Sequence, residues 1–328
     1  MSNEFKHSSV GTQLSQAEWE DVAAHTVNNA VQGRILKVSS TGSIVQDVGS
    51  LTNLLTNPGF EIWQRGAGPF TADGALTADR WFISLVAPST VSISRIASTI
   101  GTQNYSAQIA YTHAAGGAIS YQDRIENYTA FRGKTVTFAV KVKSNVAGTV
   151  YVRLSDGVTA TDSANNVGTG VETLTVTKLL DSNATILYAV IRADVASCTF
   201  EVDDAVLVVG SIAPEYVPLH PAEEMERCQR YYELIGGGND GGVMFGGYCA
   251  ASGTFEQVVQ FRTTKAVIPT TTINGTWSLT NTTLQPTLPV GSSVFNTTVR
   301  VTNSSGSAQY CAARNVGSYT NITVEANP

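Results

Sequence analysis

From residue 51 to about residue 212, apolar and polar residues alternate along the chain with a period of two. In residues 135–143, for example, Val136, Phe138 and Val140 alternate with smaller or polar residues. Because successive side chains of a strand point to opposite faces, such segments bury one face and expose the other. Turn-forming residues interrupt the alternation at short intervals. The pattern predicts an all-β fold centred on an antiparallel jelly-roll sandwich.

The last part of the chain has the same alternation, with threonine and asparagine at the outward positions. It predicts strands at residues 243–251, 254–263, 269–279, 293–302, 307–313 and 320–326. A segment of this size makes a smaller β-sandwich that is only marginally stable alone. We therefore expect oligomerisation to bury more of its surface.

The first 50 residues form a leader with a helical pattern. Ser15–Glu18 is a capping box, which predicts a short helix ending near Val27 with Trp19 and Val22 on one face. Two short apolar runs, around residues 35–38 and 44–48, predict a hairpin after it. The leader is too small to have its own core, so we expect it to dock on a partner or on copies of itself, in preference to a flexible tail.

A proline-rich connector follows the predicted sandwich. Pro221 is favourable as a first helical residue, and the pattern predicts an amphipathic helix over Pro221–Leu234. The chain is therefore expected to have four parts. These are a leader (1–50), a jelly roll (51–212), a connector with a short helix (213–242) and a C-terminal β domain (243–328).

Composition narrows the class of function. Charged residues are only 14% of the chain and the net charge is −6. With no basic patch, nucleic acid is not an expected partner. The sequence has no signal peptide and no membrane-spanning run, which predicts a protein made in a cytoplasm and not inserted into a membrane.

Few residues are arranged for catalysis. The histidines His7, His25, His113 and His220 have no metal-binding spacing, and no GxSxG motif occurs. We expect no enzymatic activity, but a glycosidase-type carboxylate pair stays open, because such pairs meet only in the fold. The carboxylates considered for it are Asp123, Glu126, Asp156 and Asp162.

The four cysteines, Cys198, Cys228, Cys249 and Cys311, are widely scattered. Their apolar surroundings predict free buried thiols, with one long-range disulfide as the alternative.

Two short motifs mark the ends of the predicted sandwich. Asn57–Trp63 reads Asn-Pro-Gly-Phe-Glu-Ile-Trp, and Phe200–Leu207 reads Phe-Glu-Val-Asp-Asp-Ala-Val-Leu. With these ends, residues 53 to 210 resemble the jelly-roll carbohydrate-binding modules of glycanases. The resemblance implies a structural calcium ion, with Glu61 and Asp203 or Asp204 as its hard oxygen ligands. The alternative is that Glu61 pairs with Arg80 and that the two aspartates cap a turn.

Aromatic residues are the expected sugar contacts, because ring faces stack on the apolar faces of pyranoses. The candidates expected to be exposed are Tyr128, Tyr248, Trp277, Tyr310 and Tyr319. Trp63 and Trp81 are expected to be core anchors. Tyr105, Tyr111 and Tyr188 are also expected in the core, because they share a parity with apolar strand neighbours.

A second resemblance covers the leader and the connector. Residues 6–20 read Lys-His-Ser-Ser-Val-Gly-Thr-Gln-Leu-Ser-Gln-Ala-Glu-Trp-Glu, and residues 227–232 read Arg-Cys-Gln-Arg-Tyr-Tyr. These segments resemble bacteriophage fibre and receptor-binding proteins. The resemblance implies a homotrimer in the virion, anchored to tail, baseplate or capsid proteins through the leader, with Leu14, Trp19 and Val22 as anchoring residues. It further implies that the β domains bind a host surface polysaccharide.

Two other interpretations stay open from the sequence. One is a virion decoration or baseplate protein without a receptor role. The other is a carbohydrate-binding module of a glycan-degrading enzyme. The leader favours the fibre, because a secreted enzyme would need a signal peptide, whereas virions leave the host by lysis.

Overall fold

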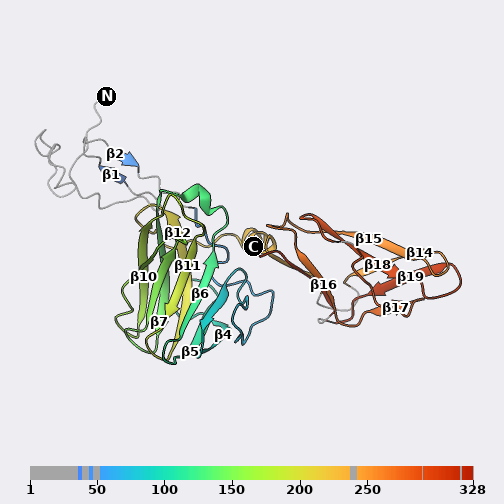
Figure 1. Cartoon of the computed structure of the whole chain (residues 1–328), viewed down its shortest axis with the longest axis horizontal. Coiled ribbons are helices and arrows are strands. Elements are labelled where there is room, and N and C mark those ends of the chain that lie inside the picture. The colour runs from blue at the N-terminus through green and yellow to red at the C-terminus, as the bar shows by residue number, and fades with distance from the viewer. Residues whose placement is uncertain are drawn as a thin grey trace, which may run out of the picture.

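The computed structural model describes residues 36–38, 44–46, 52–236, 242–289, 291–317 and 320–327. The sandwich and a narrower C-terminal β domain are joined by a short helix (Figure 1). Strands β1 (Leu36–Val38) and β2 (Ile44–Gln46) pair antiparallel, which confirms the hairpin predicted in the leader. The predicted leader helix, with Leu14, Trp19 and Val22, lies outside the described residues, as does Tyr319. In the described part of the chain, no helix is long and apolar enough to span a membrane.

Two five-stranded sheets form the sandwich. The first sheet has the order β10-β7-β12-β5-β4, and the second has the order β3-β6-β11-β8-β9. The strands are β3 (Phe82–Val86), β4 (Thr90–Ala97), β5 (Tyr105–Thr112), β6 (Ala118–Arg124), β7 (Thr135–Ser144), β8 (Val150–Ser155), β9 (Ala160–Asp162), β10 (Val171–Leu179), β11 (Tyr188–Ala193) and β12 (Cys198–Val209). The pairings are antiparallel, and the chain passes repeatedly between the two sheets, as in a jelly roll. The predicted all-β antiparallel sandwich is confirmed.

The interior between the sheets takes about every second residue of each strand. In β7 the buried valines and Phe138 face the core, as the alternation predicts. Trp81 packs against Phe60 and Tyr121, with ring centroids 4.7 and 5.3 Å apart. Trp63 and Trp81 are both buried, which confirms the two predicted core anchors.

The connecting helix α2 (Pro221–Gln229) starts at a well-formed cap. The Nδ1 atom of His220 accepts a hydrogen bond from the backbone N–H of Ala222, and Pro221 occupies the first turn. The sequence predicts a helix to Leu234, and that end is wrong. Strand β13 (Tyr232–Gly236) instead pairs with β20 (Asn321–Glu325), which satisfies the backbone groups that a longer helix would have used. The C-terminal domain therefore begins at residue 232 and not at residue 243.

Three small antiparallel sheets make up the C-terminal domain. Their orders are β13-β20-β16, β14-β19-β17 and β15-β18. The further strands are β14 (Met244–Cys249), β15 (Thr254–Gln260), β16 (Thr270–Asn274), β17 (Ser278–Thr280), β18 (Asn296–Thr302) and β19 (Gln309–Arg314). One core, which includes Phe245, Val299 and Val324, connects the three sheets.

Two arginines of the sandwich hold the start of the C-terminal domain. The Arg65 guanidinium lies 3.7 Å from the ring centroid of Tyr232, and its Nη2 atom is 2.7 Å from Glu325 Oε2. The Arg80 guanidinium lies 4.2 Å from the ring centroid of Tyr231. These cation–π and ionic contacts join the two domains directly, in addition to helix α2.

All four cysteines are buried and free. The prediction of free buried thiols is confirmed, and the alternative of a long-range disulfide is not observed.

Candidate binding sites on the sandwich

The outer face of the second sheet carries the long polar and aromatic side chains of the sandwich. In β11, Ala189 and Ile191 lie in the core, so Tyr188 and Arg192 point outward. In β8, by the same alternation, Tyr151 and Arg153 point outward. We call this surface the open face; it comprises Phe82, Ser84, Ser120, Gln122, Arg124, Tyr151, Arg153, Asp162, Tyr188, Val190, Arg192 and Asp194.

Strand register arranges the open face in three rows. The two described next lie beside a row made of Arg124, Tyr188 and Ser155. One row runs Phe82, Gln122, Val190, Arg153 and Asp162 across the five strands. The next row runs Ser84, Ser120, Arg192 and Tyr151. With neighbouring strands about 4.8 Å apart, the face is about 20 Å wide. That width suits an extended ligand rather than a single small ring.

A hydrogen-bonded cluster fixes the centre of the second row. Arg192 Nε donates to Tyr151 Oη at 2.8 Å and to Asp194 Oδ2 at 3.1 Å. Tyr151 Oη donates to Asp194 Oδ2 at 2.7 Å, and Arg192 Nη1 donates to Ser120 Oγ at 2.9 Å. Burial, followed by the hydrogen bond to Asp194, raises the pKa of Tyr151 to about 12, so the phenol keeps its proton. Tyr151 itself is buried, whereas the side chains of Arg192 and Asp194 are partly exposed and present fixed donors and acceptors to the solvent.

Aromatic and charged groups occupy the other rows of this face. The rings of Phe82 and Tyr188 meet edge to face, with centroids 6.1 Å apart. Arg153 makes a two-pronged ion pair with Asp162, at 2.5 and 2.8 Å. With Arg124 also on this face, three arginines stand against two aspartates, so the open face is slightly positive.

Two of the three tyrosines predicted to lie in the core, Tyr105 and Tyr188, lie outside it, so the prediction is wrong for both. Tyr111 is in the core as expected, but Tyr188 lies on the open face, and Tyr105 is 37% exposed under the Arg95 guanidinium. The sequence pattern is weak in β11 because two of its three inward residues are alanines, with Ile191 between them. Arg192, which has the same parity as Tyr188, is the sequence signal that identifies the outward side.

The five aromatic residues predicted to contact sugar do not gather at one site. Trp277 is 2% exposed, packs against Phe245 and donates its Nε1 hydrogen to Asn274 O, so it is a core residue and the prediction is wrong there. Tyr128 is half-buried against the sandwich core. Tyr248 and Tyr310 are exposed and lie opposite each other on β14 and β19. Tyr319 lies outside the described residues.

The predicted calcium ligands are occupied by protein donors. Asp204 Oδ2 pairs with Lys141 Nζ at 2.7 Å, and its Oδ1 accepts from the Thr102 hydroxyl at 2.9 Å. Asp203 accepts from the Ser98 hydroxyl at 2.6 Å and from the Asp204 backbone N–H at 2.7 Å. Among the described residues, no three histidine, cysteine or acidic side chains converge on one metal position. This donor set does not fit a calcium ion as arranged, and calcium stays a prediction from resemblance.

These carboxylates instead fasten the loop between β4 and β5. Glu61 accepts from the backbone N–H groups of Asn104 and Tyr105, and Glu201 accepts from the Thr99 N–H and hydroxyl. A Cβ atom at Gly101 would lie 2.0 Å from Asp203 Oδ2, so the loop can approach only with glycine there. The two sequence motifs that mark the ends of the sandwich therefore meet on one loop.

Because it is buried, the Asp203 carboxyl is a weaker acid than an ordinary aspartate. Desolvation raises its pKa to about 7, opposed by the hydrogen bonds from Ser98 and from the Asp204 N–H. The charges of Asp204 and Glu201 raise the pKa further.

Four carboxylates were candidates for a glycosidase-type pair, and each forms an ion pair with a different arginine or lysine. The ion pairs are Asp123 with Arg80, Glu126 with Arg230, Asp156 with Lys178 and Asp162 with Arg153. Arg80 thus pairs with Asp123, whereas the sequence offered Glu61 as its alternative partner. The expectation that the protein is not an enzyme stays a prediction.

No protein-family model matches the chain, and no curated protein matches it. Solved structures with a similar fold include a family 61 carbohydrate-binding module in complex with β-1,4-galactotriose, at 12% identity and a TM-score of 0.34, covering 48% of this chain and 99% of that one. Another is the family 11 module from Clostridium thermocellum with a mixed-linked tetrasaccharide, at 14% identity and a TM-score of 0.31, covering 45% and 98%. A third is the enzymatically active domain of tailspike protein 4 from bacteriophage CBA120, at 12% identity and a TM-score of 0.33, covering 48% of this chain and 21% of that one. These likenesses are too distant to assign a ligand or a virion role to this chain.

Proposed function

We propose that this protein is a structural component of a phage virion that binds a host surface glycan through the open face of its sandwich. In this proposal the protein is a homotrimer, its leader attaches to other virion proteins, and its β domains point toward the host. The observation that carries the binding role is the cluster of Tyr151, Arg192 and Asp194, in which the buried Tyr151 fixes the partly exposed side chains of Arg192 and Asp194.

The chemistry of the cluster suits sugar hydroxyls. The contacts of Arg192 use Nε and Nη1 and leave Nη2 without a partner among the described residues. A guanidinium and a neighbouring carboxylate can donate to and accept from adjacent hydroxyls, because they offer donors and acceptors side by side. Since the protein groups already brace one another, little side-chain entropy is lost when a ligand binds.

Aromatic surface on the same face, two rows from Arg192 along β11, supports the same ligand class. Tyr188 is half-buried on the outer side of β11, with Phe82 against its edge. Aromatic rings and fixed polar groups on one face are the usual composition of a ligand site, in which apolar contact supplies affinity and a few polar groups supply orientation.

The virion role is supported by the sequence of the leader and of residues 227–232. In the structure Arg230 binds Glu126 of the sandwich at 2.9 and 2.6 Å. The Tyr231 hydroxyl donates to the same carboxylate at 2.7 Å. This segment therefore links the sandwich to a distal β domain, as a fibre built of successive domains requires.

Adsorption and mass measurements test the proposal. The purified full chain should block adsorption of the parent phage and should bind envelope polysaccharide of the host on a glycan array. Light scattering should give about three times the chain mass of 34.7 kDa. A monomer at micromolar concentration would overturn the trimer, and absence of both polysaccharide binding and adsorption block would overturn the receptor role.

A further inference from the structure

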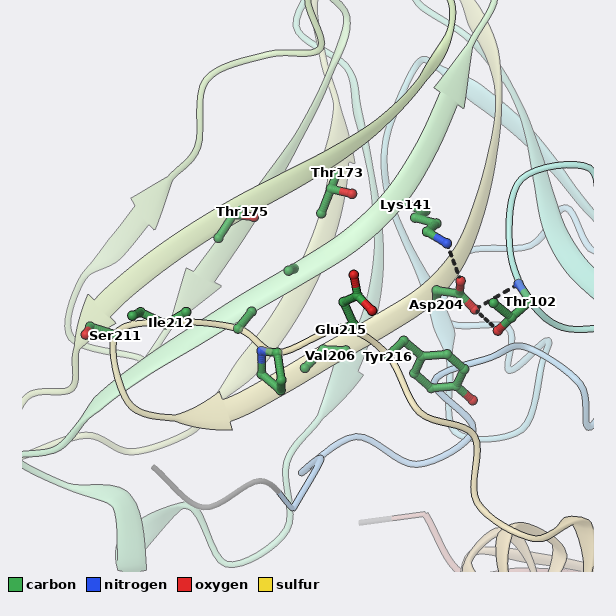
Figure 2. Close-up of a pocket in the computed structure, with 13 residues that line it drawn as sticks. Thr102, Lys141, Thr173, Thr175, Asp204, Val206, Ser211, Ile212, Glu215 and Tyr216 are labelled. Carbon is green, nitrogen blue, oxygen red and sulfur yellow. Dashed lines mark hydrogen bonds and ion pairs between the residues drawn. The ribbon is translucent and has the colours of Figure 1, made fainter. Parts of the chain in front are cut away.

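A hollow of about 520 Å³ lies on the opposite side of the sandwich, over the outer face of the first sheet (Figure 2). It forms where β12 ends and the chain turns back across the sheet. The returning segment, Ser211–Tyr216, is called the strap here, and the hollow beneath it the strap groove. The groove is of ordinary size for a small-ligand site.

Both ends of the strap are fixed. Before it, the Gly210 N–H donates to Thr135 O at 2.8 Å, and the Thr137 hydroxyl donates to Gly210 O at 2.7 Å. At its far end, the Tyr216 hydroxyl packs on Gly59, where an added Cβ would lie 2.7 Å from it. The groove is thus formed before any ligand arrives.

Short side chains under the strap leave the space. Strand register places Thr175, Ala139 and Val206 in one row and Thr173 beside Lys141 in the next. The floor of the groove therefore combines a small apolar patch with two exposed threonine hydroxyls.

Charged groups border this floor. Lys141 Nζ pairs with Asp204 Oδ2 at 2.7 Å, and Thr102 holds the other oxygen of Asp204. Figure 2 shows Glu215 extending from the strap toward the strand that carries Lys141. Glu215 has no hydrogen-bond or ion-pair partner among the described residues, so its carboxylate is free to accept. Two carboxylates against one ammonium leave the groove negative.

We infer that the strap groove is a second saccharide site, for one or two neutral sugar units, separate from the open face. The free carboxylate of Glu215 can accept from two vicinal hydroxyls, the threonines and Lys141 supply donors, and Ala139 with Val206 meets the apolar face of the ring. The excess negative charge excludes acidic sugars. The inference does not depend on ligand binding by the open face.

Saturation-transfer NMR on the full chain tests this site, with methyl β-D-glucopyranoside and methyl β-D-galactopyranoside as neutral probes and glucuronic acid as the acidic one. Thr175→Trp fills the groove from an exposed strand position and should weaken binding of a neutral probe at least tenfold. Thr254→Trp, on exposed β15 of the C-terminal domain, is the matched control and should leave binding unchanged. Glu215→Gln keeps the shape of the side chain and should weaken binding of the neutral probes at least fivefold.

The outcomes separate the two faces. Arg192→Ala removes the centre of the open face and should leave the groove signal intact. If the signal is lost in Arg192→Ala and unchanged in Thr175→Trp, all binding belongs to the open face and the inference is overturned. Absence of signal from both neutral probes, or binding of glucuronic acid as strong as theirs, would also overturn it. Thermal melting of each variant checks that it is folded.

Discussion

The two outer faces of the sandwich are built alike and differ in what covers them. Both consist of the outward residues of five antiparallel strands. On the open face, long side chains brace one another, and the buried Tyr151 holds the partly exposed Arg192. On the first sheet, short residues such as Ala139 and Thr175 leave a hollow that the strap bridges. Alternation along a strand decides which residues point outward. The segments that connect the strands decide whether those residues form an open surface or, as under the strap, a groove.

The largest effect on stability and binding is expected from a substitution in the core that lies between the two sheets. Trp81→Ala would leave a cavity among Phe60 and Tyr121 and should cost about 3–5 kcal/mol of unfolding free energy. Calorimetry should show loss of the sandwich transition and of ligand binding by both faces. Trp277→Ala is the matched control, because it should lower only the transition of the C-terminal domain. A Trp81→Ala protein with an unchanged melting temperature would contradict the described core.

A smaller effect, with a defined pH dependence, is expected at the loop beside the strap groove. The pKa of Asp203 is raised to about 7, whereas an unfolded aspartate titrates near 3.9. Between these values the folded state holds a proton that the unfolded state has lost, so stability falls as the pH rises from about 4 to about 7.

Asp203→Asn removes this titration and tests it. We compare the unfolding free energies of the variant and the wild type at each pH. From pH 5 to pH 8 the difference should shift in favour of the variant by roughly 1–2 kcal/mol, or about 2–8 °C in melting temperature. Asp79 and Asp123, with pKa values raised to about 6 and about 7, titrate in the same direction and remain in both proteins. An equal difference between variant and wild type at both pH values would count against a raised pKa of Asp203.

Removing one exposed ion pair of the open face should change binding more than stability. Arg153 and Asp162 are both partly exposed, and pairs of this kind contribute about 0–1 kcal/mol. Arg153→Ala should therefore shift the melting temperature by no more than about 4 °C, while polysaccharide affinity falls severalfold. Unchanged affinity would place the ligand away from the row that contains Arg153.

The smallest effect is expected from chelation. Because the oxygens of Asp203 and Asp204 already accept from protein donors, EDTA should leave the melting temperature unchanged. A drop of several degrees that added calcium reverses would show that a calcium ion binds and that the loop between β4 and β5 rearranges around it.

The sequence predicts the strands far better than the site, for a physical reason. Alternation is a local property, so β7 and most strands of the C-terminal domain lie where it predicts them. It fails at the end of α2, where pairing of Tyr232–Gly236 with the distant β20 overrides the helical pattern. The open face depends on contacts across strands: Tyr151 and Arg192 are 41 residues apart, and only strand register brings them together.

Calorimetric titration of host envelope polysaccharide tests the central claim most directly. The wild type and two variants are compared: Arg192→Ala on the open face, and Arg300→Ala, which removes a similar exposed arginine–carboxylate pair, with Glu256, in the C-terminal domain. We expect Arg192→Ala to weaken binding at least tenfold and Arg300→Ala to leave it unchanged. Equal affinities of wild type and Arg192→Ala, with both variants folded, would contradict it.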